Sequence, residues 1–147
     1  MHSIDLSVFI HILIQNWLIL QSYEREAYYI CNVKREPLIQ AFSQLGIVLR
    51  NIGENKPWNN FEIGITEHEY DQLISTIVRL KHHNGWFTEA MVRKAMLNIG
   101  RSLDPDSLAS WCSKYTFSSQ PKTVAVIMAG NIPLVGFHDF LCVLLSG

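Results

Sequence analysis

The residues with the clearest chemical potential lie in a short turn, residues 129–133, whose sequence is AGNIP. Asn131 carries a carboxamide whose NH₂ group is a neutral hydrogen-bond donor. Such a donor suits a carbonyl oxygen that becomes an oxyanion when an ester, thioester or aldehyde is attacked. Gly130 allows another group to approach the backbone closely, and Pro133 stiffens the turn. The turn predicts an oxyanion site, but its spacing equally fits a plainer interpretation in which Asn131 caps the following helix.

The segments on either side of this turn predict the elements that would position it. Thr123 to Met128 is continuously apolar and β-branched, which is typical of a strand covered on both faces of a parallel sheet. Val135 to Leu145 predicts an apolar helix. Ligands of open α/β sheets bind beyond the carboxyl ends of the strands, where helix amides favour negative charge. Because one strand cannot form a sheet, we expect the sequence to be the front part of a longer protein.

The other reactive side chains do not form a recognisable catalytic or metal-binding pattern. Cys31, Cys112 and Cys142 are far apart and odd in number, which argues against a disulfide framework or a Cys-rich zinc site. Cys142 falls within an apolar helical run with no His or Lys beside it, and we interpret it as core packing. His138 and Asp139 are helix neighbours and should point in different directions. We therefore predict no metal site and interpret that pair as structural.

The chain before residue 120 predicts a series of helices. Pro37 suits a first helical position and Gly53 suits the end of the same helix, and residues 54–64 read as a loop. The helix starts expected next are at Thr66, which forms a capping-box pattern with Glu69, at Thr88, and at Asp104-Pro105. Gly85 and Gly100 are expected to end the first two of these helices.

Each of these helices has an expected apolar face. The side chains assigned to them are Leu38, Phe42, Leu45, Val48 and Leu49, then Tyr70, Leu73, Ile74, Ile77 and Val78, then Val92, Ala95, Met96 and Ile99, and finally Leu108, Trp111 and Tyr115.

Composition excludes several classes of protein. The 147 residues fit one domain, 48% of them are apolar, and the net charge of −1 argues against a nucleic-acid binder. The apolar run Val8 to Leu20 is too short and too polar to span a bilayer, so we expect a packed helix and no integral membrane insertion. We divide the chain into a helical extension of unknown role (residues 1–34), a helical region (35–120) and a first βα unit (121–147), and expect a cytoplasmic protein.

One stretch resembles a known family. The run IMAGNIPLVGFHDFLCVLLSG, with HNGWFT at 83–88 and PKTVAVIMAGN from 121 upstream of it, is similar to the signature of the bacterial acyl-CoA reductases. That family includes the fatty acid reductase of bioluminescence systems and belongs to the aldehyde dehydrogenase superfamily. The similarity is good from about residue 70 to the end and weaker from 35 to 70.

The resemblance implies an α/β, aldehyde-dehydrogenase-like fold, of which this chain holds the helical N-terminal part and the first strand-turn-helix of the cofactor domain. It implies reduction of acyl-CoA or another acyl thioester to an aldehyde by NADPH (or NADH), through a cysteine acyl-enzyme, and leaves a homo-oligomer open. Asn131 matches the oxyanion donor, and Met128, Ala129 and Gly130 match residues that contact the cofactor, mostly through backbone.

Two departures from the family pattern matter. Ala129-Gly130 stands where many aldehyde dehydrogenases have Pro-Trp, and the family's catalytic cysteine corresponds to a position beyond Gly147. We therefore expect the 147-residue piece by itself to be inactive. The alternative from another class is a non-catalytic helical interaction module, with the segment 123–128 as its docking edge.

Overall fold

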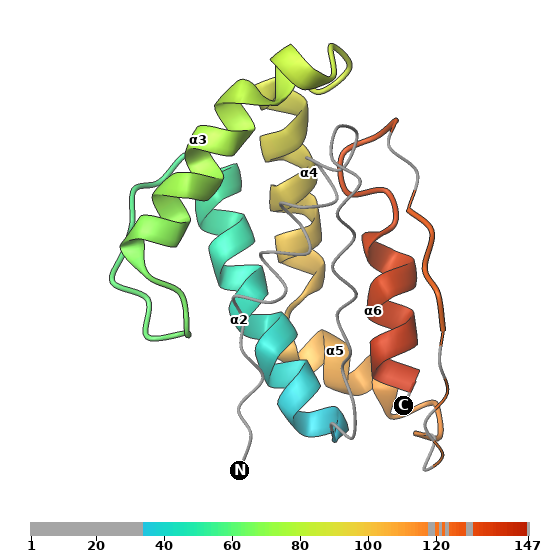
Figure 1. Cartoon of the computed structure of the whole chain (residues 1–147). Helices are drawn as coiled ribbons and strands as arrows, with labels where there is room; N and C mark the ends of the chain where they lie inside the picture. Colours follow the sequence, from blue (N-terminus) through green and yellow to red (C-terminus); the bar gives the residue numbers. More distant parts are fainter. Residues whose placement is uncertain (1–33, 118–119, 121, 123, 129–130, 147) are drawn as a thin grey trace.

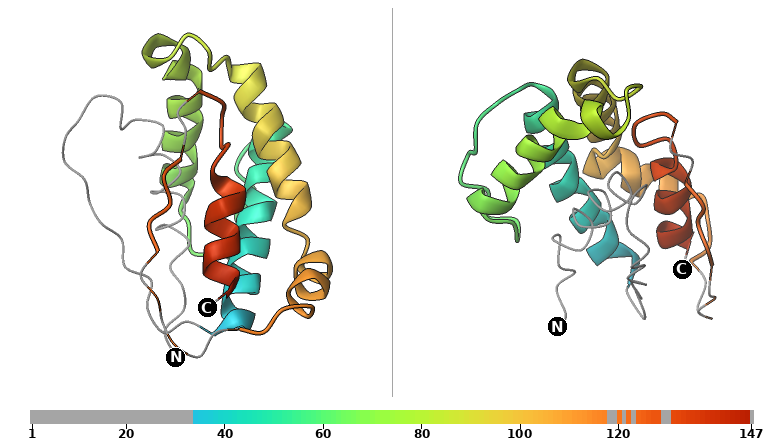
Figure 2. Two further views of the ribbon diagram at one scale, coloured as in Figure 1. Left: turned by 90° about the vertical axis from the view of Figure 1, so that its right-hand side faces the viewer. Right: turned by 45° about the horizontal axis from the view of Figure 1, so that its top comes forward.

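The computed structural model describes residues 34–117, 120, 122, 124–128 and 131–146. This part of the chain is mostly helical. Its helices are α2 (Arg35–Gly53), α3 (Glu67–His83), α4 (Glu89–Ser102), α5 (Pro105–Cys112) and α6 (Phe137–Ser146). Helix α2 is central, because it contacts α4, α5 and α6, while α3 packs against α4 (Figures 1 and 2). The predicted extension, Cys31 included, lies outside the described residues except for Lys34.

Helix α2 forms the core because its apolar side chains recur at helical spacing. Its buried residues include all five that the sequence pattern assigned to this face: Leu38, Phe42, Leu45, Val48 and Leu49. The ring of Phe42 contacts Phe137 and Phe140 of α6 edge-on, at centroid distances of 6.2 and 6.3 Å. Helix α6 therefore shares one core with α2, although none of the described residues between α5 and α6 is helical.

The closest packing in the described structure joins α2 to α4 through glycines. A Cβ added to Gly100 would lie 2.8 Å from both the Arg50 backbone nitrogen and the Gly46 carbonyl oxygen. A Cβ added to Gly53 would lie 2.6 Å from Cβ of Leu97. The two backbones approach so closely that no side chain fits between them at these positions. Gly100, expected to end its helix, is instead buried inside α4, which continues to Ser102.

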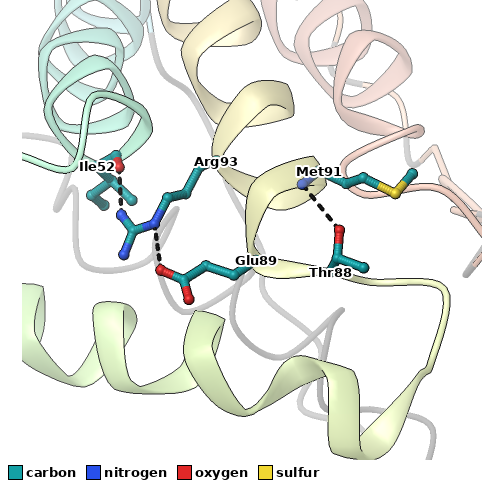
Figure 3. A network of polar contacts seen from close by, with 5 residues as sticks. All are labelled: Ile52, Thr88, Glu89, Met91 and Arg93. Atoms are coloured by element: carbon teal, nitrogen blue, oxygen red, sulfur yellow. Dashed lines mark hydrogen bonds and ion pairs between the residues drawn. The ribbon is translucent and has the colours of Figure 1, made fainter.

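Two arginines, one on each helix of this pair, donate hydrogen bonds to the opposite helix. Arg93 of α4 is buried, donates from Nη1 to the Ile52 carbonyl oxygen of α2 at 2.6 Å, and forms an ion pair with Glu89 at 2.8 Å (Figure 3). Arg50 of α2 donates in return to the Gly100 carbonyl oxygen of α4. Each arginine thus binds a carbonyl in the last turn of the other helix, where carbonyls lack the partner four residues later that the helix interior supplies.

The end of α2 corrects the expected glycine cap. Gly53 is the last helical residue, and Asn55 takes the left-handed conformation with φ 56°. The Asn55 amide donates to the Ile52 oxygen and the Lys56 amide to the Asn51 oxygen, which is the paired hydrogen-bond pattern of a Schellman cap. Asparagine tolerates this conformation, so Gly53 is left available for packing against α4.

The helix starts predicted at Thr66, Thr88 and Asp104 are confirmed, whereas α2 begins at Arg35, two residues before the predicted Pro37. Thr66 and Glu69 form a complete capping box, in which the Thr66 amide donates to the Glu69 carboxylate at 2.7 Å. Thr88 accepts from the Met91 amide at 3.3 Å (Figure 3), and Asp104 accepts from the Ser107 amide at 2.9 Å. All three signals are contained within one turn, so they act wherever the chain is placed.

Some details of the following helices were predicted wrongly. Helix α3 ends at His83, but its cap residue Asn84 is extended and Gly85 has no positive φ. Val78 was assigned to the buried face of α3 and is 44% exposed. Tyr115 was assigned to the apolar face of the last predicted helix before residue 120, yet it lies beyond the end of α5 and is exposed. Val78 lies at the edge of its helical face, and Tyr115 lies past a helix end that falls earlier than predicted, so the exposure of both depends on the neighbouring elements.

The predicted strand Thr123–Met128 is not found. Thr123 lies outside the described residues, and Val124–Met128 form neither strand nor helix. Figure 1 shows this segment as a stretched trace that leads to α6, and no backbone hydrogen bond joins it to another described residue. A strand exists only as part of a ladder, and the described part of the chain offers it no second strand. The predicted α/β arrangement is therefore absent from these residues, whereas the helix predicted after it is confirmed as α6.

None of the helices in the described ranges combines the length and the apolar character that crossing a membrane requires.

We predict that Gly100→Ala destabilises the protein although alanine is the better helix former. The new methyl group would press on the Arg50 and Gly46 backbone, and overpacking of this kind costs about 1–3 kcal/mol. Urea unfolding measures the change. Gly85→Ala, where nothing lies within 4 Å of the added carbon, is the control and should be close to neutral. Equal effects of the two substitutions would contradict the close packing.

We also predict that Asp104 makes folding pH-dependent in the acid range. Hydrogen bonds from Ser107 hold the pKa of this carboxyl below its ordinary value of 3.8. Its stabilising contribution is then complete above pH 3.8 and is lost as the pH falls through the lowered pKa. Asp104→Asn keeps a capping side chain that does not titrate. Urea midpoints of the two proteins should therefore differ less in acid than at neutral pH, and a pH-independent difference would contradict this.

Candidate functional site

The turn that precedes α6 holds the candidate residue Asn131. Asn131 and Ile132 are exposed, whereas Pro133 and Leu134 are buried against the core. The carboxamide of Asn131 has no hydrogen-bond partner among the described residues. Helix α6 begins at Phe137, six positions later, so Asn131 does not occupy the cap position that the plainer interpretation gave it. Its NH₂ group is free to donate to a molecule outside the described chain.

The backbone of this turn is strained at a residue that the sequence did not single out. Leu134 has φ 60°, a left-handed conformation that branched apolar residues rarely adopt. The Leu134 carbonyl accepts from the Phe137 amide at 3.0 Å, and its side chain is buried. Burial of the leucine in the core thus holds the turn in shape, at a conformational cost of about 1–2 kcal/mol. No local signal predicts a left-handed leucine, since only the core contact favours it.

Of the three predicted cofactor-contacting residues, only Met128 is described; Ala129 and Gly130 lie outside the described residues. The half-buried Met128 side chain lies directly over Gly136, where an added Cβ would be 2.3 Å from Cγ of Met128. Gly136 immediately precedes α6. The Met128 side chain therefore packs against the residue that directly precedes α6.

A cysteine and a histidine lie together on α6, and sequence reasoning missed them. Cys142 Sγ is 3.5 Å from Nε2 of His138, one helical turn earlier, and the His138 ring lies beside the ring of Trp111 at a centroid distance of 6.2 Å. The statement that Cys142 has no histidine beside it is therefore wrong. The i, i+4 spacing would have revealed the pair, because residues four apart share one helix face.

This contact does not make Cys142 a nucleophile. Burial, and secondarily the negative charge of Asp139, raise the pKa of the Cys142 thiol. Burial also raises the pKa of the Cys112 thiol, although Arg35 opposes the shift. Both thiols are thus held in the protonated form, whereas nucleophilic cysteines need a lowered pKa. Within the described ranges no three His, Cys, Asp or Glu side chains gather as metal ligands.

Comparison of the chain with protein-family models, with curated protein sequences and with solved structures gave no match.

We predict that Cys112 and Cys142 react slowly with iodoacetamide at neutral pH. Their raised pKa values keep the thiolate fraction below that of an exposed cysteine, so the rate should rise as the pH rises, with Cys142 faster than the more deeply buried Cys112. Mass spectrometry of the peptides gives each rate separately, and a free cysteine peptide is the control. Alkylation of Cys142 faster than that peptide at neutral pH would contradict the assignment.

Proposed function

We propose that the chain is the N-terminal part of an NAD(P)H-dependent acyl-CoA reductase, which converts a fatty acyl thioester to an aldehyde through a cysteine acyl-enzyme. The observation that supports this most is the exposed, unpartnered carboxamide of Asn131, within the run 121–147 that resembles that family. In this proposal the protein is cytoplasmic, and Val124–Met128 is the first strand of an α/β cofactor domain once neighbouring strands pair with it.

Asn131 would act on the thioester carbonyl. When a thiolate attacks this carbonyl, negative charge collects on its oxygen, and a fixed neutral donor stabilises that charge without having to lose a proton. Buried Pro133 and Leu134 anchor the backbone that carries the exposed Asn131 side chain, and the bound thioester would fix the carboxamide itself. The nucleophile would be a cysteine other than Cys112 and Cys142, because both of these have raised pKa values.

The described residues do not by themselves fit the nicotinamide cofactor. A dinucleotide phosphate needs open helix amides beyond a paired strand, but Met128 covers Gly136 at the start of α6 and Val124–Met128 is unpaired. The cofactor assignment therefore depends on the resemblance alone, and we derive no chemical step through it.

A second candidate function is a non-catalytic interaction module. The observation that favours it is the exposure of apolar side chains around the same turn: Ile127 is 94% exposed, and Val124 and Ile132 are each 54% exposed. Exposed apolar side chains that lie close together in the sequence fit a segment that binds another protein surface.

We predict that the purified 147-residue chain does not reduce a fatty acyl-CoA with NADPH or NADH. Among its described residues it presents an oxyanion donor but no activated thiol. Nicotinamide absorbance and aldehyde formation give the rate, and a rate above that of buffer would contradict the assignment of roles.

The reading frame that follows the Gly147 codon distinguishes the two candidates. A continuation that encodes a cysteine-containing α/β domain supports the reductase, whereas a stop codon favours the interaction module. In a continued protein, Asn131→Ala should lower kcat about 10²–10³-fold, as expected for loss of one oxyanion donor. Ile132→Ala, next to it on the exposed turn, is the matched control.

A further inference from the structure

The segment Val124–Met128 presents a free backbone edge. None of its amides or carbonyls forms a backbone hydrogen bond with another described residue. Unpaired extended backbone is a template for strand pairing, because every second residue offers a donor and an acceptor in the same direction.

The side chains of this segment already alternate as in a strand. From Ala125 to Met128 the exposure alternates: Ala125 and Ile127 are exposed, while Val126 and Met128 are half-buried. Val124, which is 54% exposed, departs from this alternation at the start of the segment. Alternation with a period of two leaves one face of the segment on the protein and the other face in solvent. The segment could therefore pair at its edge without repacking the core beneath it.

The charge pattern favours a second copy of the same segment as the pairing partner. No charged residue occurs from Thr123 to Phe137, so two copies would bring no like charges together, and the chain's net charge of −1 gives little repulsion at longer range. In an antiparallel pair centred on Val126, the large Ile127 of each copy lies opposite the small Ala125 of the other. This arrangement has the self-complementarity that a two-fold interface requires.

We propose that this chain forms a homodimer in which Val124–Met128 of two copies pair as antiparallel strands. The interface consists of one short strand pair and its outward side chains, so the dimer is weak and forms at high protein concentration. The proposal concerns the 147-residue chain and uses neither Asn131 nor a substrate. In a longer α/β protein the neighbouring strands would occupy the same edge, so the dimer is a property of the chain without them.

Sedimentation velocity of the whole chain over a concentration series tests the proposal. We expect the mass to rise from that of one chain to that of two. Ile127→Lys should weaken the association about tenfold or more, because it places two like charges within the strand pair. Trp86→Lys is the matched control: Trp86 is a larger apolar side chain, 79% exposed and distant in sequence, and its loss should leave the dimer unchanged.

Amide hydrogen exchange supplies a readout of strand pairing itself. The amides of Val124–Met128 should exchange more slowly at dimer-forming concentrations than in dilute solution, and Ile127→Lys should abolish that difference. A chain that stays monomeric throughout the series overturns the proposal. So does association that Trp86→Lys weakens as much as Ile127→Lys, or association without added protection of these amides.

Discussion

The close approach of α2 and α4 is the contact on which the rest of the described structure depends. Glycines let the two backbones touch, and Arg50 and Arg93 each donate to a carbonyl of the opposite helix. Helix α6 packs on a different face of α2, where the rings of Phe137 and Phe140 contact the ring of Phe42. Helix α2 contacts both α4 and α6. The packing of α2 against α4 therefore helps to place the turn before α6, although neither of these two helices contributes a residue to that turn.

The same packing explains how the turn can present Asn131. Pro133 and Leu134 are buried against the helices, so the chain on either side of them is held, while Asn131 and Ile132 remain exposed. The strain at Leu134 is maintained by that burial. A hydrogen-bond donor presented on a rigid turn is useful for binding a developing negative charge, and exposed apolar side chains beside it are useful for binding another polypeptide. The two proposed functions therefore draw on neighbouring parts of one surface.

The His138–Cys142 pair illustrates why proximity does not establish reactivity. The two groups lie on one face of α6, yet burial and Asp139 raise the pKa of the thiol. Reasoning from the sequence interpreted Cys142 as core packing, but it overlooked the histidine one turn away. The local environment therefore opposes thiolate formation even with a potential proton acceptor within reach.

The sequence alone determined where α3, α4 and α5 begin and which face of α2 is buried. Caps such as Thr66 with Glu69 act within a single turn, and helical spacing needs no knowledge of the partner. Only the tertiary structure decided what the glycines do, because Gly100 is fixed by residues about fifty positions earlier, and Asn55 rather than Gly53 adopts the left-handed cap. It also decided that Val124–Met128 pairs with no other segment of the described chain. A β-branched apolar pattern favours the strand conformation, but a strand forms only where a second strand lies within hydrogen-bonding distance.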